Sequence, residues 1–263
     1  MLIHLDENLN SYSEHNIKSI FRGLNYGDGA FETMIFENGK VKDFDLHMKR
    51  LNFGLHNIGI DLFDQGAINN IHQLIKSNIY ESLSKVKIYV IRKEGGKYLP
   101  HHSSKKIILE SEPFDGYQFK ILSKVDFIEN IRNYYSPISS FKSLSSLNYV
   151  VAGLEIKNNQ LHDGIIKDVN GNISECLTSN IFWIKNNQLY TPNLQTGCIN
   201  GISSQKIISH FDVREVMAPE DELRSTESIF TTNVASMHLL ENIKGHRLNT
   251  NHPLLRSIKE YLF

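Results

Sequence analysis

The sequence predicts an α+β fold arranged as two domains. The chain has 263 residues, a length that suits one large domain or two ordinary ones. Segments that alternate apolar and polar residues, as strands do, are interspersed with segments whose apolar residues recur at helical spacing. The clearest interruption is Glu112-Pro-Phe-Asp-Gly-Tyr117, where proline and Asp-Gly break both patterns. We therefore expect one domain over residues 1–114 and a second over residues 115–263.

The first half is expected to contain three strands and two helices. Gly27-Asp28-Gly29 is a turn signal that feeds a strand, and Asp45 is a helix start signal followed by apolar residues at helical spacing. Arg50 lies on one flank of this helix. Residues 1–22 are polar and weakly patterned. The expected elements are a strand at 31–36, a helix from 45 to about 55, a helix at about 65–77, and strands at 85–92 and 106–110.

The second half is expected to alternate strands with three helices. A serine-rich stretch precedes an apolar helical pattern, so Lys142 falls where a loop becomes a helix. Asn170-Gly171 is a hairpin turn signal, and Glu175 follows it between strands. The expected elements are a strand near 119–123, a helix through 147–154, strands at 181–184 and 189–191, a helix that begins at Gly201, a segment at 211–215, a strand at 227–234, and a closing helix after Pro253.

The composition excludes several classes of partner. The net charge of −1 gives no electrostatic reason to expect nucleic acid or an anionic membrane as a partner. The start of the chain lacks a basic region followed by an apolar run, and no apolar stretch is long enough to span a bilayer. The two cysteines, Cys176 and Cys198, lack C-x-x-C spacing and are expected to be buried, reduced thiols. We therefore expect a cytoplasmic protein.

Common catalytic motifs are mostly absent. No H-E-x-x-H occurs, and the adjacent pair His101-His102 cannot aim both rings at one metal from a single strand or helix, so we expect no metal site. Neither G-x-x-x-x-G-K-[ST] nor G-x-G-x-x-G is present. Ser139-Ser-Phe-Lys142 matches S-x-x-K, which would make Ser139 the nucleophile of an acyl-transfer enzyme, but the partner motifs S-D-N and K-T-G are missing.

Four features remain: Lys142, Glu175, Arg50 and the helix start at Gly201. Taken singly, each has an ordinary explanation as a solvated charge, an exposed strand residue or a turn. Taken together, they suit pyridoxal 5'-phosphate. This cofactor needs an amine for its Schiff base, a carboxylate that keeps its pyridine nitrogen protonated, and a cationic cradle rich in N–H groups for its phosphate.

The sequence resembles the class IV, fold-type IV pyridoxal-phosphate enzymes, which include branched-chain aminotransferases, D-amino acid aminotransferases and 4-amino-4-deoxychorismate lyases. The motifs that carry this resemblance occur in the family's order over nearly the whole chain: Tyr-Gly-Asp-Gly-Ala-Phe-Glu-Thr at 26–33, His47-Met-Lys-Arg-Leu51, Lys142-Ser-Leu, Glu175 to Phe182, Thr191-Pro192, Gly201-Ile-Ser and Phe230-Thr-Thr-Asn233. The resemblance implies a small N-terminal α/β domain, a larger β-barrel-like C-terminal domain with helices that carries the Schiff-base lysine, and a homodimer.

The resemblance also implies the roles of individual residues. Lys142 would form the Schiff base and Glu175 would bind the pyridine nitrogen. The phosphate ligands implied by the resemblance are Arg50, the backbone N–H groups of Ile202 and Ser203 next to Gly201, the Ser203 hydroxyl, and Thr232 or Asn233. One departure concerns the residue after Gly-Ile-Ser, where the family usually has arginine and this chain has Ser204. The cradle is mostly backbone and should survive this change, but a neighbouring ion pair would be absent.

The reaction implied is that of an aminodeoxychorismate lyase of folate biosynthesis. The run Ser143-Leu-Ser-Ser-Leu147 lacks the tyrosine that branched-chain aminotransferases usually carry after the lysine, and Asn233 is similar to the lyases. The loop at 92–98 resembles a glycine-rich lyase loop, in which Arg92 and Lys97 are candidate ligands of substrate carboxylates. Thr33 is a candidate proton donor. An aminotransferase acting on D-amino or branched-chain amino acids, a non-catalytic cofactor-binding protein and an S-x-x-K acyl-transfer enzyme are the alternatives.

Overall fold

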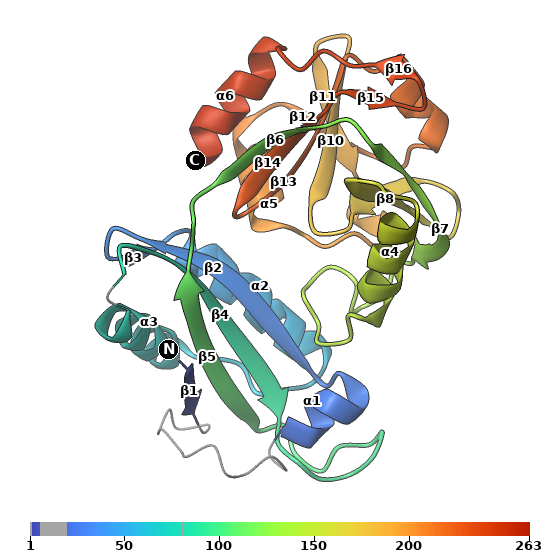
Figure 1. Cartoon of the computed structure of the whole chain (residues 1–263). Coiled ribbons are helices and arrows are strands. Elements are labelled where there is room, and N and C mark those ends of the chain that lie inside the picture. The colour runs from blue at the N-terminus through green and yellow to red at the C-terminus, as the bar shows by residue number, and fades with distance from the viewer. Residues whose placement is uncertain (1, 6–19, 80) are drawn as a thin grey trace. The chain divides into compact units, whose positions relative to one another are not determined.

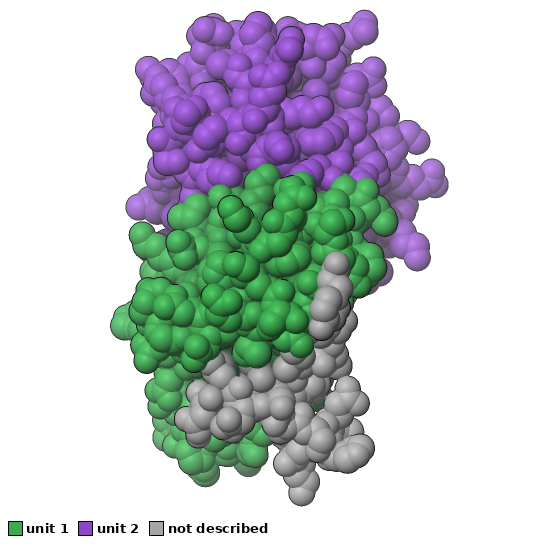
Figure 2. Space-filling model, turned by 90° about the vertical axis from the view of Figure 1, so that its left-hand side faces the viewer, with its two compact units in different colours: residues 1–116, 141–146 green, residues 117–140, 147–263 purple. Residues whose placement is uncertain are grey.

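The chain forms two compact units. The computed structural model describes residues 2–5, 20–79 and 81–263 (Figure 1). Unit 1 consists of Met1–Gly116 and Phe141–Ser146, and unit 2 consists of Tyr117–Ser140 and Leu147–Phe263 (Figure 2). The main division lies two residues from the boundary expected from the sequence. The segment with Lys142 differs from that expectation, because it packs with the N-terminal unit.

Unit 1 is built on one antiparallel sheet of five strands with the order β1-β5-β4-β2-β3. Its elements are β1 (Leu2–Leu5), α1 (Phe21–Tyr26), β2 (Gly29–Glu37), β3 (Lys40–Val41), α2 (Phe44–Asn57), α3 (Gln65–Asn78), β4 (Leu83–Arg92) and β5 (Lys105–Pro113). The predicted strands and helices of the first half are confirmed. The elements β1 and α1 lie in and beside the weakly patterned first 22 residues and were not expected.

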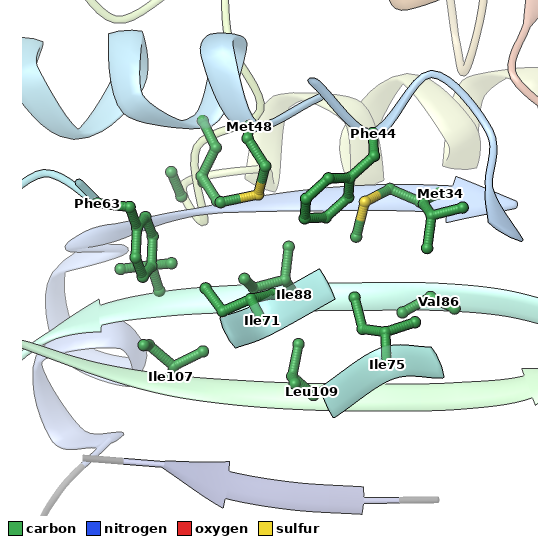
Figure 3. Packing of buried hydrophobic residues seen from close by; sticks show 14 of the residues in the cluster. Met34, Phe44, Met48, Phe63, Ile71, Ile75, Val86, Ile88, Ile107 and Leu109 are labelled. Carbon is green, nitrogen blue, oxygen red and sulfur yellow. The ribbon is translucent and has the colours of Figure 1, made fainter. Parts of the chain in front are cut away.

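The core of unit 1 lies between this sheet and the helices α2 and α3. Both helices turn apolar residues toward the sheet, and Figure 3 shows Ile71 and Ile75 of α3 close to Val86, Ile88 and Leu109 of β4 and β5. Every second residue of a strand faces the same side. The alternating apolar residues of β4 and β5 therefore form part of the sheet face on which both helices pack.

The segment Phe141–Ser146 extends this unit. The N–H group of Phe31 donates to the carbonyl of Lys142 over 2.9 Å, and the N–H group of Leu144 donates to the carbonyl of Gly29 over 3.0 Å. The ring of Phe141 is 3% exposed and belongs to the same core. These contacts fix the backbone of Lys142 beside the first residues of β2.

Unit 2 contains a six-stranded sheet with the order β12-β11-β10-β13-β14-β6, a three-stranded sheet with the order β7-β8-β9, and the two-stranded sheet β15-β16. Its elements are β6 (Gln118–Leu122), β7 (Val125–Asn133), α4 (Leu147–Asn158), β8 (Asp163–Asp168), β9 (Ile173–Cys176), β10 (Asn180–Lys185), β11 (Gln188–Pro192), η2 (Leu194–Thr196), α5 (Ile202–His210), β12 (Val213–Val216), η3 (Glu220–Ser225), β13 (Ser228–Asn233), β14 (Ser236–Leu240), β15 (Asn242–Ile243), β16 (His246–Arg247) and α6 (Pro253–Leu262).

The strand β10 is buried on both faces. Its residues alternate between two cores: Ile181 and Trp183 face one, and Phe182 and Ile184 face the other, which α6 covers. The ring of Phe182 stacks on that of Phe230 with a centroid distance of 5.1 Å. A strand with two buried faces reads as an unbroken apolar run. This is why Ile-Phe-Trp-Ile identified a strand in the sequence although it does not alternate.

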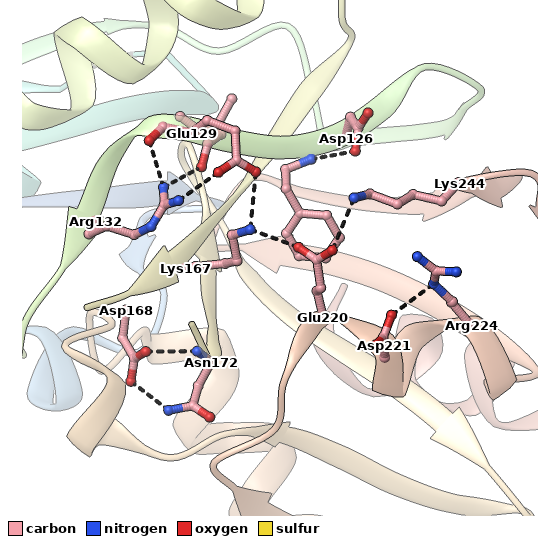
Figure 4. A network of polar contacts seen from close by, with 12 residues as sticks. Asp126, Glu129, Arg132, Lys167, Asp168, Asn172, Glu220, Asp221, Arg224 and Lys244 are labelled. Carbon is pink, nitrogen blue, oxygen red and sulfur yellow. Dashed lines mark hydrogen bonds and ion pairs between the residues drawn. The ribbon is translucent and has the colours of Figure 1, made fainter. Parts of the chain in front are cut away.

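An ion-pair network joins several elements at the surface of unit 2 (Figure 4). Lys167 of β8 lies 3.0 Å from Glu129 of β7 and 2.7 Å from Glu220 of η3. Lys244, beyond β15, adds a contact of 3.1 Å to Glu220. The hydrogen bond from Lys167 lowers the pKa of Glu220, and Lys244 adds to this effect. The network thus adds polar contacts between elements that also share one hydrophobic core.

The close approach of Gly54 to Phe141 gives a first testable prediction. A Cβ atom at Gly54 would lie 2.5 Å from the Phe141 ring. Overpacking a core costs about 1–3 kcal/mol and alanine favours a helix over glycine by about 1 kcal/mol, so Gly54→Ala should lower the free energy of unfolding by about 1 kcal/mol. Urea denaturation measures this change. The control is Gly66→Ala in α3, where a Cβ approaches nothing closer than Asp64 Oδ1 at 3.4 Å; equal or greater loss in the control would contradict the prediction.

Candidate active site

A buried carboxylate, Glu175, lies in the three-stranded sheet of unit 2. It is 3% exposed and belongs to β9. Its Oε1 atom accepts hydrogen bonds from the Tyr149 hydroxyl at 2.7 Å and the Asn133 side-chain amide at 2.9 Å, and its Oε2 atom accepts from the N–H group of Ile199 at 3.1 Å. These three donors are neutral, so they orient the carboxylate without cancelling its charge.

The hairpin that carries Glu175 follows from its turn residues. The carboxylate of Asp168 accepts the N–H groups of Asn170 and Asn172 at 2.9 and 2.7 Å, and Gly171 adopts a φ of 85°. Asx side chains stabilise such turns by binding the backbone ahead of them, and glycine adopts positive φ without strain. The predicted hairpin at Asn170-Gly171 is confirmed by the antiparallel pairing of β8 with β9.

The start of α5 offers a cradle of N–H groups. The first N–H group with a partner four residues back is that of Gln205, which binds the Gly201 carbonyl at 2.9 Å. The N–H groups of Ile202, Ser203 and Ser204 precede it and have no partner inside the helix. Both serines are buried. Exposed N–H groups and the helix dipole at such a position favour an anion.

Gly201 leaves no space for a side chain beside this cradle. A Cβ atom there would collide with Oδ1 of Asn180, whose amide nitrogen donates to the Ile199 carbonyl at 2.7 Å. Ile199 thus binds Asn180 through its carbonyl and Glu175 through its N–H group. Through Ile199, the structure therefore connects the Glu175 carboxylate to the predicted cradle of Gly201, Ile202 and Ser203 within unit 2.

Thr232 and Asn233 lie at the end of β13. Thr232 pairs with Asn180 of β10, and its hydroxyl donates to the Ser236 carbonyl at 3.0 Å. The side-chain amide of Asn233 donates to the carbonyl of Thr178 at 3.2 Å, and its oxygen accepts the N–H group of Ala235 at 2.8 Å. Thr232 is thus the strand partner of Asn180, the residue that contacts Gly201. The side chains of Thr232 and Asn233 also bind backbone groups of the β13–β14 turn.

Arg50 forms a buried cluster within unit 1. Its guanidinium nitrogens lie 2.7 and 2.6 Å from the two oxygens of Glu32, and Nδ1 of His47 lies 2.7 Å from Oε2 of the same carboxylate. Burial alone would raise the pKa of Glu32, but the charge of Arg50 and the hydrogen bonds from His47 and Arg50 lower it to about 2. Glu32 thereby fixes the direction of the arginine expected to bind phosphate. No role was expected for Glu32 or His47 from the sequence, although both lie within the motifs at 26–33 and 47–51.

Lys142 and Thr33 belong to unit 1. The Nζ atom of half-buried Lys142 lies 4.6 Å from the centroid of the Phe31 ring. Thr33, also half-buried, lies two residues beyond Phe31 in β2 and therefore faces the same side of the sheet. The lysine nitrogen and the candidate proton donor thus share one face of unit 1.

Arg92 has another role than the one expected. It is 4% exposed; its Nε donates to Asp28 at 2.9 Å, and its other nitrogens bind the carbonyls of Gly59, His102 and Ile58. Arg22 binds the same Asp28 carboxylate at 2.7 Å and the carbonyls of residues 95, 96 and 97 at 2.9, 3.1 and 3.0 Å. Both guanidinium groups therefore hold the loop at 93–104, and Lys97 contributes its carbonyl to this arrangement.

Other candidate groups have ordinary environments. The Ser139 hydroxyl donates to the Ser136 carbonyl at 3.0 Å, and Ser139 belongs to unit 2 whereas Lys142 belongs to unit 1. Cys176 and Cys198 are free and buried, and burial together with the Glu175 charge raises the pKa of Cys198 to about 12. In the described part of the chain, no helix combines the length and apolar character needed to span a membrane.

A model of the amino-transferase class IV family matches residues 29–239. The chain belongs to this family. Enzymes of the family depend on pyridoxal 5'-phosphate, so this protein is a PLP-dependent enzyme. Its fold is that of the fold-type IV enzymes, as the sequence indicated.

Two relatives and one solved structure illustrate the range of the family. An aminodeoxychorismate lyase from Bacillus subtilis is 29% identical over 202 residues, which cover 72% of this chain and 66% of the relative. A D-alanine aminotransferase from Bacillus licheniformis is 23% identical over 88% of this chain and 84% of its own. The structure of 4-amino-4-deoxychorismate lyase from Pseudomonas aeruginosa superimposes with a TM-score of 0.83 at 20% identity, covering 100% of this chain and 98% of that one.

The residues of unit 2 fit this cofactor. A buried carboxylate held by neutral donors is suited to a cationic pyridinium nitrogen, because a buried charge requires an opposite charge or several hydrogen bonds. The helix start at Gly201 is suited to a phosphate, since its first N–H groups have no partner inside the helix and the helix dipole favours an anion there. Lys142 and Arg50, which the sequence also suggested for this cofactor, belong to unit 1.

The crowding at Gly201 gives a prediction about the cofactor. The variant Gly201→Ala should displace Asn180 or the helix start and weaken the binding of pyridoxal 5'-phosphate by about tenfold or more, which equals about 1.4 kcal/mol. Absorbance titration of the apoprotein measures this affinity. Gly153→Ala in α4 is the control, because a Cβ there meets only the Leu177 side chain at 3.7 Å. Unchanged affinity in Gly201→Ala would show that this helix start is not the phosphate cradle.

The buried Glu32 cluster gives a prediction about acid stability. The pKa of Glu32 in the folded chain, about 2, is below its ordinary value of 4.5. Ionised Glu32 therefore stabilises the fold above pH 4.5, and this contribution is lost as the pH falls from 4.5 toward 2. We expect wild type to lose about 2 kcal/mol more stability than Glu32→Gln between pH 7 and pH 3, as measured by urea denaturation. Parallel curves for the two proteins would refute this, and Glu260→Gln on exposed α6 should follow wild type.

Proposed function

We propose that this enzyme is a lyase that converts 4-amino-4-deoxychorismate into 4-aminobenzoate and pyruvate. The observation that carries this proposal is the similarity to the Bacillus subtilis aminodeoxychorismate lyase, which extends over 72% of the chain. The residues after Lys142 support it, because Ser143-Leu-Ser-Ser-Leu147 contains no tyrosine. The role of the enzyme in folate biosynthesis, a homodimeric assembly and a cytoplasmic location are parts of the same proposal, and the free thiols of Cys176 and Cys198 agree with a reducing compartment.

In this proposal each residue has a defined task. Lys142 would hold the cofactor through its aldehyde, and Glu175 would hold the pyridine nitrogen. The groups that would hold the phosphate are Arg50, the Ile202 and Ser203 N–H groups, the Ser203 hydroxyl, and Thr232 or Asn233. The bound cofactor supplies an electron sink for the carbon that carries the substrate amine.

The chain's own residues then move the protons. With the cofactor bound, the Lys142 amine would remove the proton from the amine-bearing ring carbon of the substrate. The ether bond to the enolpyruvyl group breaks and the leaving group gains a proton, for which Thr33 is the candidate donor. The products are pyruvate and an aromatic ring, whose aromaticity favours the forward reaction. Lys97 remains a candidate ligand of a substrate carboxylate, whereas Arg92 serves the loop.

An aminotransferase is the second candidate, because the Bacillus licheniformis D-alanine aminotransferase is similar over 88% of the chain. It would use Lys142 and Glu175 in the same positions. Lys142 would instead return the proton to the cofactor carbon, so that the amino group stays on the cofactor until a 2-oxo acid removes it. The requirement for a 2-oxo acid separates the two reactions.

The test is an assay with 4-amino-4-deoxychorismate and no added 2-oxo acid. We expect formation of 4-aminobenzoate, followed by its fluorescence, and an equal amount of pyruvate. Absence of both products, together with glutamate formation from 2-oxoglutarate and D-alanine or leucine, would replace the lyase by the aminotransferase. Lys142→Ala and Lys142→Arg serve as controls: both should lose at least about 1000-fold in kcat, since neither provides a nucleophile or a base.

A further inference from the structure

The hydroxyl group of Tyr149 donates a hydrogen bond to the Glu175 carboxylate. Tyr149 lies on α4, two residues after the helix begins, and its hydroxyl donates to Oε1 at 2.7 Å. Its ring packs against the cluster of Ile128, Ala152 and Ile166. Burial first, and then the charge of Glu175, raise the pKa of Tyr149 far above its ordinary value. The phenol therefore stays protonated and remains a hydrogen-bond donor.

The other donors to Glu175 are fixed by the sheets and loops. Asn133 of β7 donates to Oε1 and also to the Ser174 hydroxyl at 3.0 Å, which in turn donates to the Thr196 carbonyl at 3.1 Å. The Ile199 contact comes from the backbone. Tyr149 is thus the contribution of helix α4, and it shares one carboxylate oxygen with Asn133. Two donors on one oxygen fix the rotation of the carboxylate about its last bond and stabilise its charge.

We propose that Tyr149 is a positioning residue that acts through Glu175 on the ring nitrogen of the cofactor. This inference rests on the role of Glu175 in the proposed function. With the hydroxyl present, Oε1 is held by side chains and the carboxylate cannot turn, so its orientation toward the pyridinium nitrogen is set before the cofactor binds. Without the hydroxyl, the carboxylate loses a donor to its charged form and gains freedom to rotate. The ring nitrogen then meets a partner that is less well ordered and less stable as an anion.

The test uses two ligands that differ at one atom. Apoprotein is titrated with pyridoxal 5'-phosphate and with the analogue that carries C–H in place of the ring nitrogen, and both dissociation constants are measured from absorbance. We expect Tyr149→Phe to weaken the binding of pyridoxal 5'-phosphate by about tenfold, the size of one charge-assisted hydrogen bond at its lower limit. Binding of the analogue should change less than about twofold, since it has no ring nitrogen for Glu175 to bind.

Phenylalanine keeps the packing of the ring, and urea denaturation of each variant checks that the fold is retained. The matched control is Tyr190→Phe: Tyr190 lies on β11 and stacks on Trp183 with a centroid distance of 6.0 Å. It should leave both dissociation constants unchanged. Tyr149→Phe would overturn the proposal if it left both affinities unchanged, or if it weakened both ligands equally, because the latter result means that Tyr149 acts on packing alone.

Failure of the proposed function gives a different result. If wild type bound the two ligands equally well, or if Glu175→Gln left the preference for pyridoxal 5'-phosphate intact, Glu175 would not bind the ring nitrogen and both proposals would fall. A preference that Glu175→Gln abolishes but Tyr149→Phe preserves would remove only the role of Tyr149. The measurement needs no substrate, so it does not depend on whether the enzyme is a lyase or an aminotransferase.

Discussion

The organisation of unit 2 depends on the hydrogen bonds to one buried carboxylate, that of Glu175. Glu175 loses its hydration when β9 is covered, and an isolated buried charge is strongly destabilising. Three donors from separate parts of the unit compensate: β7, α4 and the segment before α5. Each donor brings its element to the same carboxylate. The acid that the chemistry requires therefore also determines where the helix α4 and the start of α5 must lie.

Unit 1 meets the same constraint in a different way. There the buried Glu32 is matched by a full positive charge from Arg50 and by His47, both on α2. An arginine binds both carboxylate oxygens in a fixed plane, which gives it a defined direction. Neutral groups from three parts of unit 2 thus donate to one carboxylate, whereas the other is held by a cation and a histidine of its own unit.

The sequence predicted much of the fold because local signals were strong. The amphipathic pattern after Asp45, the alternation at 85–92 and the apolar run at 181–184 each reflect a neighbouring core, and the structure has α2, β4 and β10 at these positions. The strand β7 was not predicted. Its pairing with β8 contains a register shift between Ile128 and Arg132, and such an irregularity breaks the alternation that identifies a strand.

The site was predictable in its residue types but not in its connections. Motif resemblance identified Lys142, Glu175 and Gly201, whereas Tyr149 donates to a carboxylate 26 positions away and Arg92 binds backbone carbonyls that have no sequence signature. The grouping of segment 141–146 with unit 1 has no local signal for a similar reason: its hydrogen bonds to Phe31 and Gly29 join positions more than 100 residues apart.

The loop at 93–104 is held through its backbone. Arg22 and Arg92 hold it by main-chain oxygens at positions 95, 96, 97 and 102, so its path is independent of most of its side chains. Residues such as exposed Tyr98 and Leu99 can therefore be exchanged during evolution while the loop keeps its course, which lets the surface chemistry of this region diverge without a cost to the scaffold.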